Sequence, residues 1–166
     1  ETARGLIAGY GGLGRAMAWP LVFTGKMDDV PPPGIVAAAA CTVFNIIGIV
    51  VGAAVLVITL INLYVPSFTI DPLLAKNLIY FFGHVFVNAS IYMAVIGVYE
   101  ILPTYTGRKW KTSRVFAIAW SCVLLMVMAV YPHHLMQDVA MPGWLLVMGQ
   151  IVSFGNALPL LGVTAF

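Results

Sequence analysis

Apolar residues in this chain form long blocks, not the stripes with a period of three to four residues that mark a soluble amphipathic helix. A helix that crosses the apolar core of a bilayer needs roughly 20 such residues. The blocks therefore predict four membrane spans, at about residues 35–62, 73–102, 115–137 and 144–166. The predicted fold class is all-α, a polytopic bundle of transmembrane helices.

Polar and proline-rich segments separate these blocks. Residues 25–34 contain a run of three prolines, which cannot continue a helix. Several glycines and Arg15 precede that run and disfavour a spanning helix there. We therefore expect residues 1–33 to form an interfacial segment and a loop, and residues 34–166 to form the transmembrane part.

Composition supports a membrane protein. The chain has 166 residues, of which 61% are hydrophobic and 8% are charged, whereas about a quarter of the residues of a soluble domain are charged. The small net charge of +2 does not indicate a nucleic-acid partner. The high share of hydrophobic residues predicts that lipid surrounds the protein. The chain starts at Glu1 and stops at Phe166 inside an apolar run. We expect it to be an internal piece of a longer subunit.

Basic residues predict the orientation of the spans. Arg108, Lys109, Lys111 and Arg114 cluster between the second and third blocks, while the segments after the first and third blocks contain no lysine or arginine. The positive-inside rule places the 103–114 segment in the cytoplasm. The second span then runs inward and the third runs back out.

The chain contains three histidines, His84, His133 and His134. His84 lies roughly 16 Å into the second span from its outer end, at 1.5 Å per residue. The histidine pair lies near the outer end of the third span, after Pro132, which removes one backbone hydrogen bond and can distort the turn. Adjacent antiparallel helices would bring the three side chains together.

Three imidazoles at one depth suggest a metal site. Neutral imidazole binds copper, iron or zinc, and three histidines with an open position are typical of a catalytic metal. The alternative is structural. The pair would then be hydrogen-bonded to water and loop carbonyls at the interface, and His84 would be a packing histidine. Their matching depth favours the metal site.

Two stretches of the sequence resemble a known family. FFGHVFVNASIYMAVIGVYEILP (81–103) and VYPHHLMQDVAMPGW (130–144) are similar to subunit I of the haem-copper oxidase superfamily. In that family, a histidine of helix VI and a His-His pair of helix VII bind a non-haem metal beside a high-spin haem. The resemblance covers about residues 34–166, which would be helices V to VIII of a subunit of about twelve helices. It implies that the three histidines are the metal ligands.

The chain departs from the family pattern at one informative position. Most oxygen reductases of the superfamily have a tyrosine four residues after the first histidine, where this chain has Asn88, and the others have one in helix VII, where this chain has Val127. That tyrosine supplies an electron and a proton for splitting oxygen. Reduction of nitric oxide needs two electrons, and the nitric oxide reductases of the superfamily lack the tyrosine. Asn88 would donate a hydrogen bond to bound NO, or else only bond a neighbouring helix.

Three further polar residues are candidates for supporting roles. Glu100 could start a proton path, and Tyr92, which lies on the His84 face of the helix, could be a link in it. Glu100 could instead reach the headgroups and pair with Arg108 or Lys109. Lys76 lies two turns outward of His84 and would either contact a haem propionate or snorkel to the surface.

The predicted protein is part of the catalytic subunit of a haem-copper oxidoreductase, with reduction of NO to N2O favoured. Reduction of O2 to water with proton pumping is the alternative, and a non-catalytic bundle or transporter is an alternative of another class. The resemblance implies low-spin and high-spin haem, with their ligands elsewhere in subunit I. Three histidines favour copper over iron, since the iron-bearing relatives add a carboxylate. The implied partners are the rest of subunit I, a cupredoxin-like or cytochrome subunit II, and cytochrome c or a copper protein as electron donor, in a bacterial or archaeal cell membrane.

Overall fold

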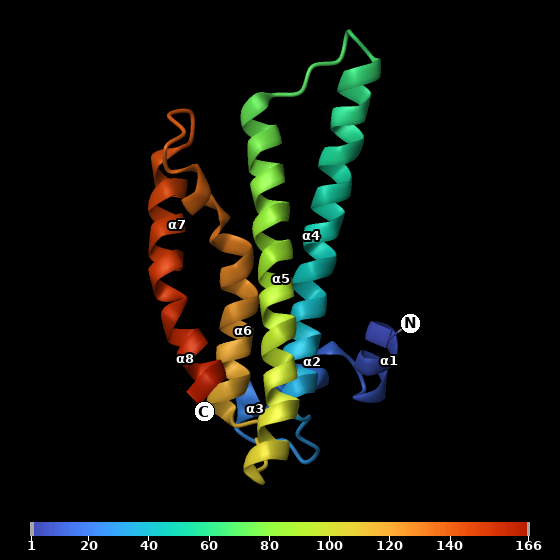
Figure 1. Cartoon of the computed structure of the whole chain (residues 1–166), viewed down its shortest axis with the longest axis vertical. Helices are drawn as coiled ribbons and strands as arrows, with labels where there is room; N and C mark the ends of the chain where they lie inside the picture. Colours follow the sequence, from blue (N-terminus) through green and yellow to red (C-terminus); the bar gives the residue numbers. More distant parts are fainter. Residues whose placement is uncertain (1, 166) are drawn as a thin grey trace.

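Long helices standing side by side form this protein. The computed structural model describes residues 2–165, which contain helices and no strand. The long elements are α4 (Pro33–Tyr64), α5 (Pro72–Thr106), α6 (Arg114–Ala129), and α7 (Gly143–Gly155) followed by α8 (Ala157–Ala165) (Figure 1). Four helical segments are long and apolar enough to cross a membrane. The predicted all-α bundle with four spans is therefore confirmed.

Helix α5 is longer than the sequence predicts. It continues through Pro103 to Thr106, whereas the expected end is residue 102. The Thr104 and Thr106 hydroxyls donate to the carbonyls of Glu100 and Leu102, at 3.1 and 2.8 Å, in this last turn. Gly107, at φ 65°, then ends the helix in the left-handed conformation that glycine adopts without strain.

Glycines allow α4 and α5 to pack closely. A Cβ atom at Gly52 would lie 2.6 Å from Cδ2 of Phe82, and one at Gly48 would lie 2.8 Å from Cγ1 of Val85. Small residues commonly permit such close approach between membrane helices. Because Phe82 and Val85 face α4, the rotation of α5 about its axis is set, and the neighbouring His84 faces another side.

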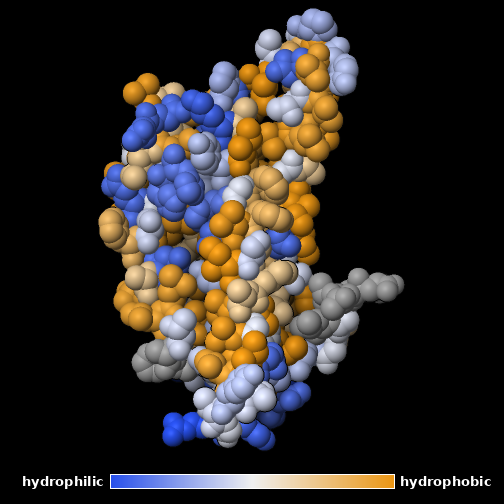
Figure 2. Space-filling view, viewed as in Figure 1, coloured by the Kyte–Doolittle hydropathy of each residue, from blue (hydrophilic) through white to orange (hydrophobic). Residues whose placement is uncertain are grey.

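Aromatic rings fill the core between α4, α5 and α6. Phe44 and Trp120 are fully buried and Tyr92 is almost so. The Tyr92 ring lies 6.1 Å from the Phe44 ring and 5.4 Å from the Trp120 ring, both edge-on. Apolar side chains also cover much of the face seen in Figure 2, and polar ones gather at its two ends and over the connection between α6 and α7. An apolar exterior of this kind is expected for helices that contact lipid or further helices of a membrane subunit.

The N-terminal part consists of short helices, α1 (Thr2–Gly9), α2 (Leu13–Ala16) and α3 (Trp19–Thr24), at the same end as the basic loop (Figure 1). The Arg114 guanidinium donates to the Val22 carbonyl at 3.1 and 3.0 Å. None of these helices is long enough to span a bilayer. Met17 is nevertheless fully buried, so this segment packs into the bundle more deeply than a purely interfacial segment would.

Candidate metal centre

The histidine pair lies on a short 3-10 turn. Helix α6 ends at Ala129, and η1 (Tyr131–Leu135) follows within the same apolar segment, so the turn at Pro132 departs from the α-helical form. Pro132 has no N–H to continue the α-helical hydrogen bonds. The backbone N–H of His133 instead donates to the Val130 carbonyl at 3.1 Å. This change of backbone lets two consecutive side chains point toward the same place.

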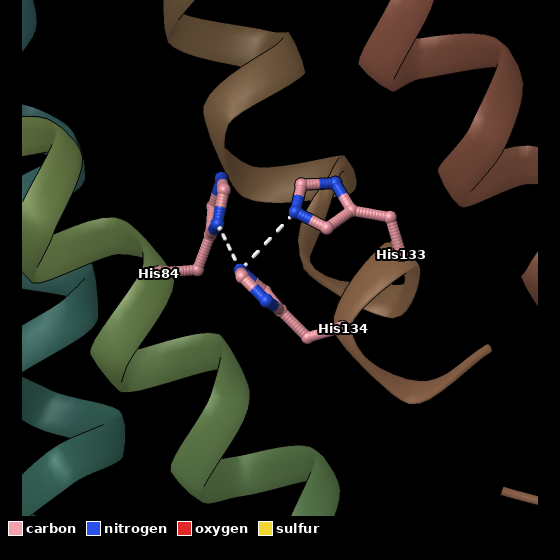
Figure 3. Close-up of side chains that lie close together, drawn as sticks. All are labelled: His84, His133 and His134. Carbon is pink, nitrogen blue, oxygen red and sulfur yellow. Dashed lines mark hydrogen bonds between the residues drawn. The ribbon is translucent and has the colours of Figure 1, made fainter. Parts of the chain in front are cut away.

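The three imidazole rings converge between α5 and η1 (Figure 3). Nδ1 of His84 lies 3.0 Å from Nε2 of His134, which lies 3.1 Å from Nε2 of His133. One nitrogen from each ring can be chosen so that all three lie within 4.8 Å of one another. The structure thus brings together the three histidines, which were expected to meet because they lie at similar depths in adjacent spans.

This donor set fits a metal ion. Bonds from imidazole nitrogen to zinc are roughly 2.0–2.1 Å, so two nitrogens on one tetrahedral ion lie about 3.3 Å apart. The two observed separations are a few tenths of an ångström shorter, a difference that small ring rotations remove. In the described part of the chain, the group of side chains that could hold a metal here contains no carboxylate.

An open cleft of about 570 Å³ borders the histidines. Its walls are mainly apolar, formed by Ile79, Val87 and Ile91 of α5, with Gly83 leaving open space beside the rings. The Tyr80 ring stacks on His134 at a centroid distance of 5.7 Å and an angle of 18°. All three histidines therefore border one mainly apolar cleft.

Asn88 lies one helical turn from His84 and contacts it twice. Its side-chain Nδ2 lies 2.9 Å from Nε2 of the ring and donates to the His84 backbone carbonyl at 2.9 Å. Asn88 also lines the cleft. Its position is therefore compatible with two roles: contact with a ligand bound in the cleft, and orientation of the His84 ring.

Tyr92 and Glu100 lie farther along α5, toward the basic loop. Tyr92 is buried against Phe44 and Trp120, and Glu100 lies over Gly34, where a Cβ atom would be 2.6 Å from its carboxylate oxygen. Within residues 2–165, no hydrogen bond joins Tyr92 to His84 or to Glu100. In the same range, Glu100 forms no ion pair with the basic loop, which was its structural alternative.

Lys76 has a partner that the sequence did not suggest. Its ammonium lies 2.6 Å from a carboxylate oxygen of Asp138, in the turn that follows η1. The hydrogen bond from Lys76 holds the pKa of the Asp138 carboxyl below its ordinary value. The pair joins the outer end of α5 to the segment that carries His133 and His134.

Two more residues at the site escaped the sequence analysis. Asn77 forms hydrogen bonds with Tyr131 and Met141, the two ends of the histidine-bearing segment 131–141. Gly149 of α7 lies against the backbone of this segment, where a Cβ atom would be 2.7 Å from the His133 nitrogen. The spacing of Asn77, His84 and Asn88 along one helical face was a usable signal for Asn77. Nothing in the sequence pattern marks Gly149. In the part of the chain that the structure describes, the buried Nδ1 of His133 has no hydrogen-bond partner.

Comparison with known proteins yields one match. The family model for cytochrome c and quinol oxidase polypeptide I matches residues 16–166, which includes all three histidines and extends nearer the N-terminus than the resemblance seen from residue 34. Neither the curated proteins nor the solved structures gave a match.

Proposed function

The chain belongs to the family of cytochrome c and quinol oxidase polypeptide I, and on that premise we propose that His84, His133 and His134 bind its non-haem metal. Family membership implies a haem-copper oxidoreductase within a membrane complex of several subunits. The observation that carries the ligand assignment is the convergence of three ring nitrogens, with separations of 3.0 and 3.1 Å. Nitrogen donors without a carboxylate favour copper over iron.

The cleft beside the histidines fits a large apolar cofactor. The family implies haem, and Ile79, Gly83, Val87 and Ile91 would contact the high-spin haem from the α5 side. Metal and haem together would supply the binding place for a diatomic gas and the electrons that reduce it. The ligands of both haems would come from other parts of subunit I.

We favour nitric oxide as the substrate because Asn88 occupies the position of the tyrosine of most oxygen reductases. An amide cannot supply the electron and proton that splitting oxygen requires. Reduction of two NO with two electrons and two protons gives N2O and water and needs no such donor. With a metal on Nδ1 of His84, the ring hydrogen is on Nε2 and needs an acceptor. The Asn88 amide, whose Nδ2 lies 2.9 Å from Nε2, would have to turn so that Oδ1 accepts this hydrogen, and it would then hold the ring in place.

Turnover of both gases by the purified complex tests this choice. The expected result is N2O formation from NO at a rate well above any consumption of O2. The alternative is reduction of O2 to water with proton pumping. Robust O2 reduction without N2O formation would establish that alternative and refute our choice.

Metal content tests the ligand assignment. In the complex with His84→Ala, the non-haem metal should fall to a small fraction of its occupancy, since two remaining imidazoles bind the metal far more weakly than three. The low-spin haem spectrum should remain, which shows that the complex is still assembled. Full metal occupancy in this variant would refute the assignment.

The remaining parts of the proposal lie around this centre. Tyr92 and Glu100 would serve a proton path from the basic loop, which would need water molecules between them. Lys76 would contact a haem propionate from its place beside Asp138. A cupredoxin-like or cytochrome subunit II would pass electrons from cytochrome c or a copper protein, in a bacterial or archaeal cell membrane.

A non-catalytic bundle or transporter is the proposal's rival of another class. Membership of a family of oxidases favours the catalytic interpretation. The absorption spectrum of the intact complex discriminates, because a catalytic subunit of this family contains haem. A complex without haem would support the rival.

A further inference from the structure

One face of α5 contacts the whole histidine-bearing segment. Asn77, Phe81, His84 and Asn88 follow one another at intervals of four, three and four residues, which places them on one stripe of the helix. Of the two inner members, His84 belongs to the ring cluster. Phe81 lies beside it and packs edge-on against Tyr131, at a centroid distance of 5.5 Å. Asn77 is the outermost member of the stripe and is half-buried.

Asn77 connects to both ends of the segment that runs from Tyr131 to Met141. The Tyr131 hydroxyl donates to Oδ1 of Asn77 at 3.1 Å, just before the histidine pair. Nδ2 of Asn77 lies 3.4 Å from the sulfur of Met141, after it. The same Nδ2 donates to the Leu73 carbonyl of its own helix at 2.8 Å, which fixes the direction of the amide.

This arrangement differs from the neighbouring ion pair. The Lys76 side chain is 52% exposed, and an exposed ion pair contributes little to holding a segment in place. Asn77 instead uses both atoms of a half-buried amide, and the segment it holds has few regular backbone hydrogen bonds because it is a 3-10 turn followed by loops. A displaced η1 would carry both histidine rings away from His84.

We propose that Asn77 is a positioning residue for the three-histidine centre. It holds the segment 131–141 at a height along α5 where His133 and His134 face His84. Without this amide, the segment would have to be ordered when the metal binds, and that cost would weaken binding. The proposal rests on the proposed metal site.

The test is copper affinity in the intact membrane complex. Copper is removed with a chelator, and copper(I) is titrated back against a colorimetric competitor. Asn77→Ala should weaken copper binding by about tenfold, as is typical when a supporting residue of a metal site is removed. Tyr131→Phe keeps the ring against Phe81 and loses only the hydroxyl, so a loss of roughly fivefold is expected from one hydrogen bond.

A double variant and a matched control separate positioning from general loosening. Tyr131→Phe should cause no further loss in the Asn77→Ala background, since the two residues share one bond. Asn62 is also a half-buried asparagine at the outer end of a helix, and its Nδ2 donates to the Phe68 carbonyl at 2.8 Å, in the loop between α4 and α5. Asn62→Ala should leave copper affinity unchanged.

Electron paramagnetic resonance of the copper(II) form gives a second readout. The hyperfine coupling of Asn77→Ala should differ from that of the wild type, because the ligand geometry changes, while that of Asn62→Ala should not. Wild-type affinity and coupling in Asn77→Ala, or equal losses in both asparagine variants, would overturn the role of Asn77 and leave the metal site standing. Failure of the wild-type complex to bind copper would overturn both proposals.

Discussion

Gly149 is the position at which the packing of α7 against the histidine turn can be measured. A Cβ atom there would lie 2.7 Å from the His133 nitrogen, 3.0 Å from the Pro132 carbonyl carbon and 3.1 Å from its Cβ. The first two are backbone atoms, which cannot rotate away as the end of a long side chain can. Gly149→Ala therefore forces either α7 or η1 to move.

Two effects of opposite sign determine the size of the change. Overpacking costs about 1–3 kcal/mol, and replacing glycine by alanine inside a helix contributes roughly 1 kcal/mol of stability. The net expectation is a loss of up to about 2 kcal/mol. If this strain is present in the metal-bound state and is relieved when the metal leaves, copper binding weakens by up to about 30-fold.

Gly155 is the matched control in the same helix. A Cβ atom there would meet only Cε of Met126, at 3.7 Å, an ordinary contact with a flexible side chain. Thermal unfolding of the purified complex and copper titration should show losses for Gly149→Ala and none for Gly155→Ala. Equal behaviour of the two variants would show that α7 does not press on the histidine turn, and the packing argument would fail.

Two further changes address the ends of the bundle. Because Lys76 lowers the pKa of Asp138, the ion pair stabilises the folded state at neutral pH, and this contribution disappears as the pH falls below the ordinary pKa of aspartate, about 4. The difference in melting temperature between the wild type and Asp138→Asn should therefore shrink in acid and at high salt. Tyr99→Phe keeps the packing of its ring and removes the donor to the Val163 carbonyl at 2.6 Å, so chemical denaturation should show a loss of about 1–3 kcal/mol for the unpaired buried carbonyl; unchanged stability would mean that water replaces the hydroxyl.

The spans were predictable because the physics that sets them is local. A block of apolar residues long enough for a bilayer must form a helix, since no water is present to bond its backbone. The ends were less predictable. Thr104 and Thr106 extend α5 beyond Pro103 through hydrogen bonds of their own side chains, and hydropathy alone does not register such bonds.

The meeting of the three histidines was predictable from depth alone. Counting residues from the basic loop places His84 and the 133–134 pair at similar heights on adjacent helices. Their directions were not predictable in the same way, because consecutive helical residues diverge by about 100°. The 3-10 turn after α6 resolves this divergence, and Pro132 was the only sequence sign of it.

The supporting residues depend on tertiary contacts that leave little trace in one sequence. The sequence pattern indicates only that Asp138 is in a loop and that Gly149 is a small residue in an apolar block. Their roles follow only from what lies opposite them, Lys76 in one case and the His133 backbone in the other. Conversely, the burial of Met17 shows that a glycine-rich segment too short to span a bilayer can still pack into the core.

Two faces of α5 connect the packing of the bundle to the candidate metal site. Phe82 and Val85 press on Gly52 and Gly48 of α4, and this contact sets the rotation and height of α5. His84 lies between those two positions in the sequence but points to η1, so any change of rotation at the glycines moves its ring. The α4 glycines touch none of the three histidines, yet the 3.0 Å separation between Nδ1 of His84 and Nε2 of His134 depends on them. The geometry of the site is therefore a property of the α4–α5 interface as much as of the histidines themselves.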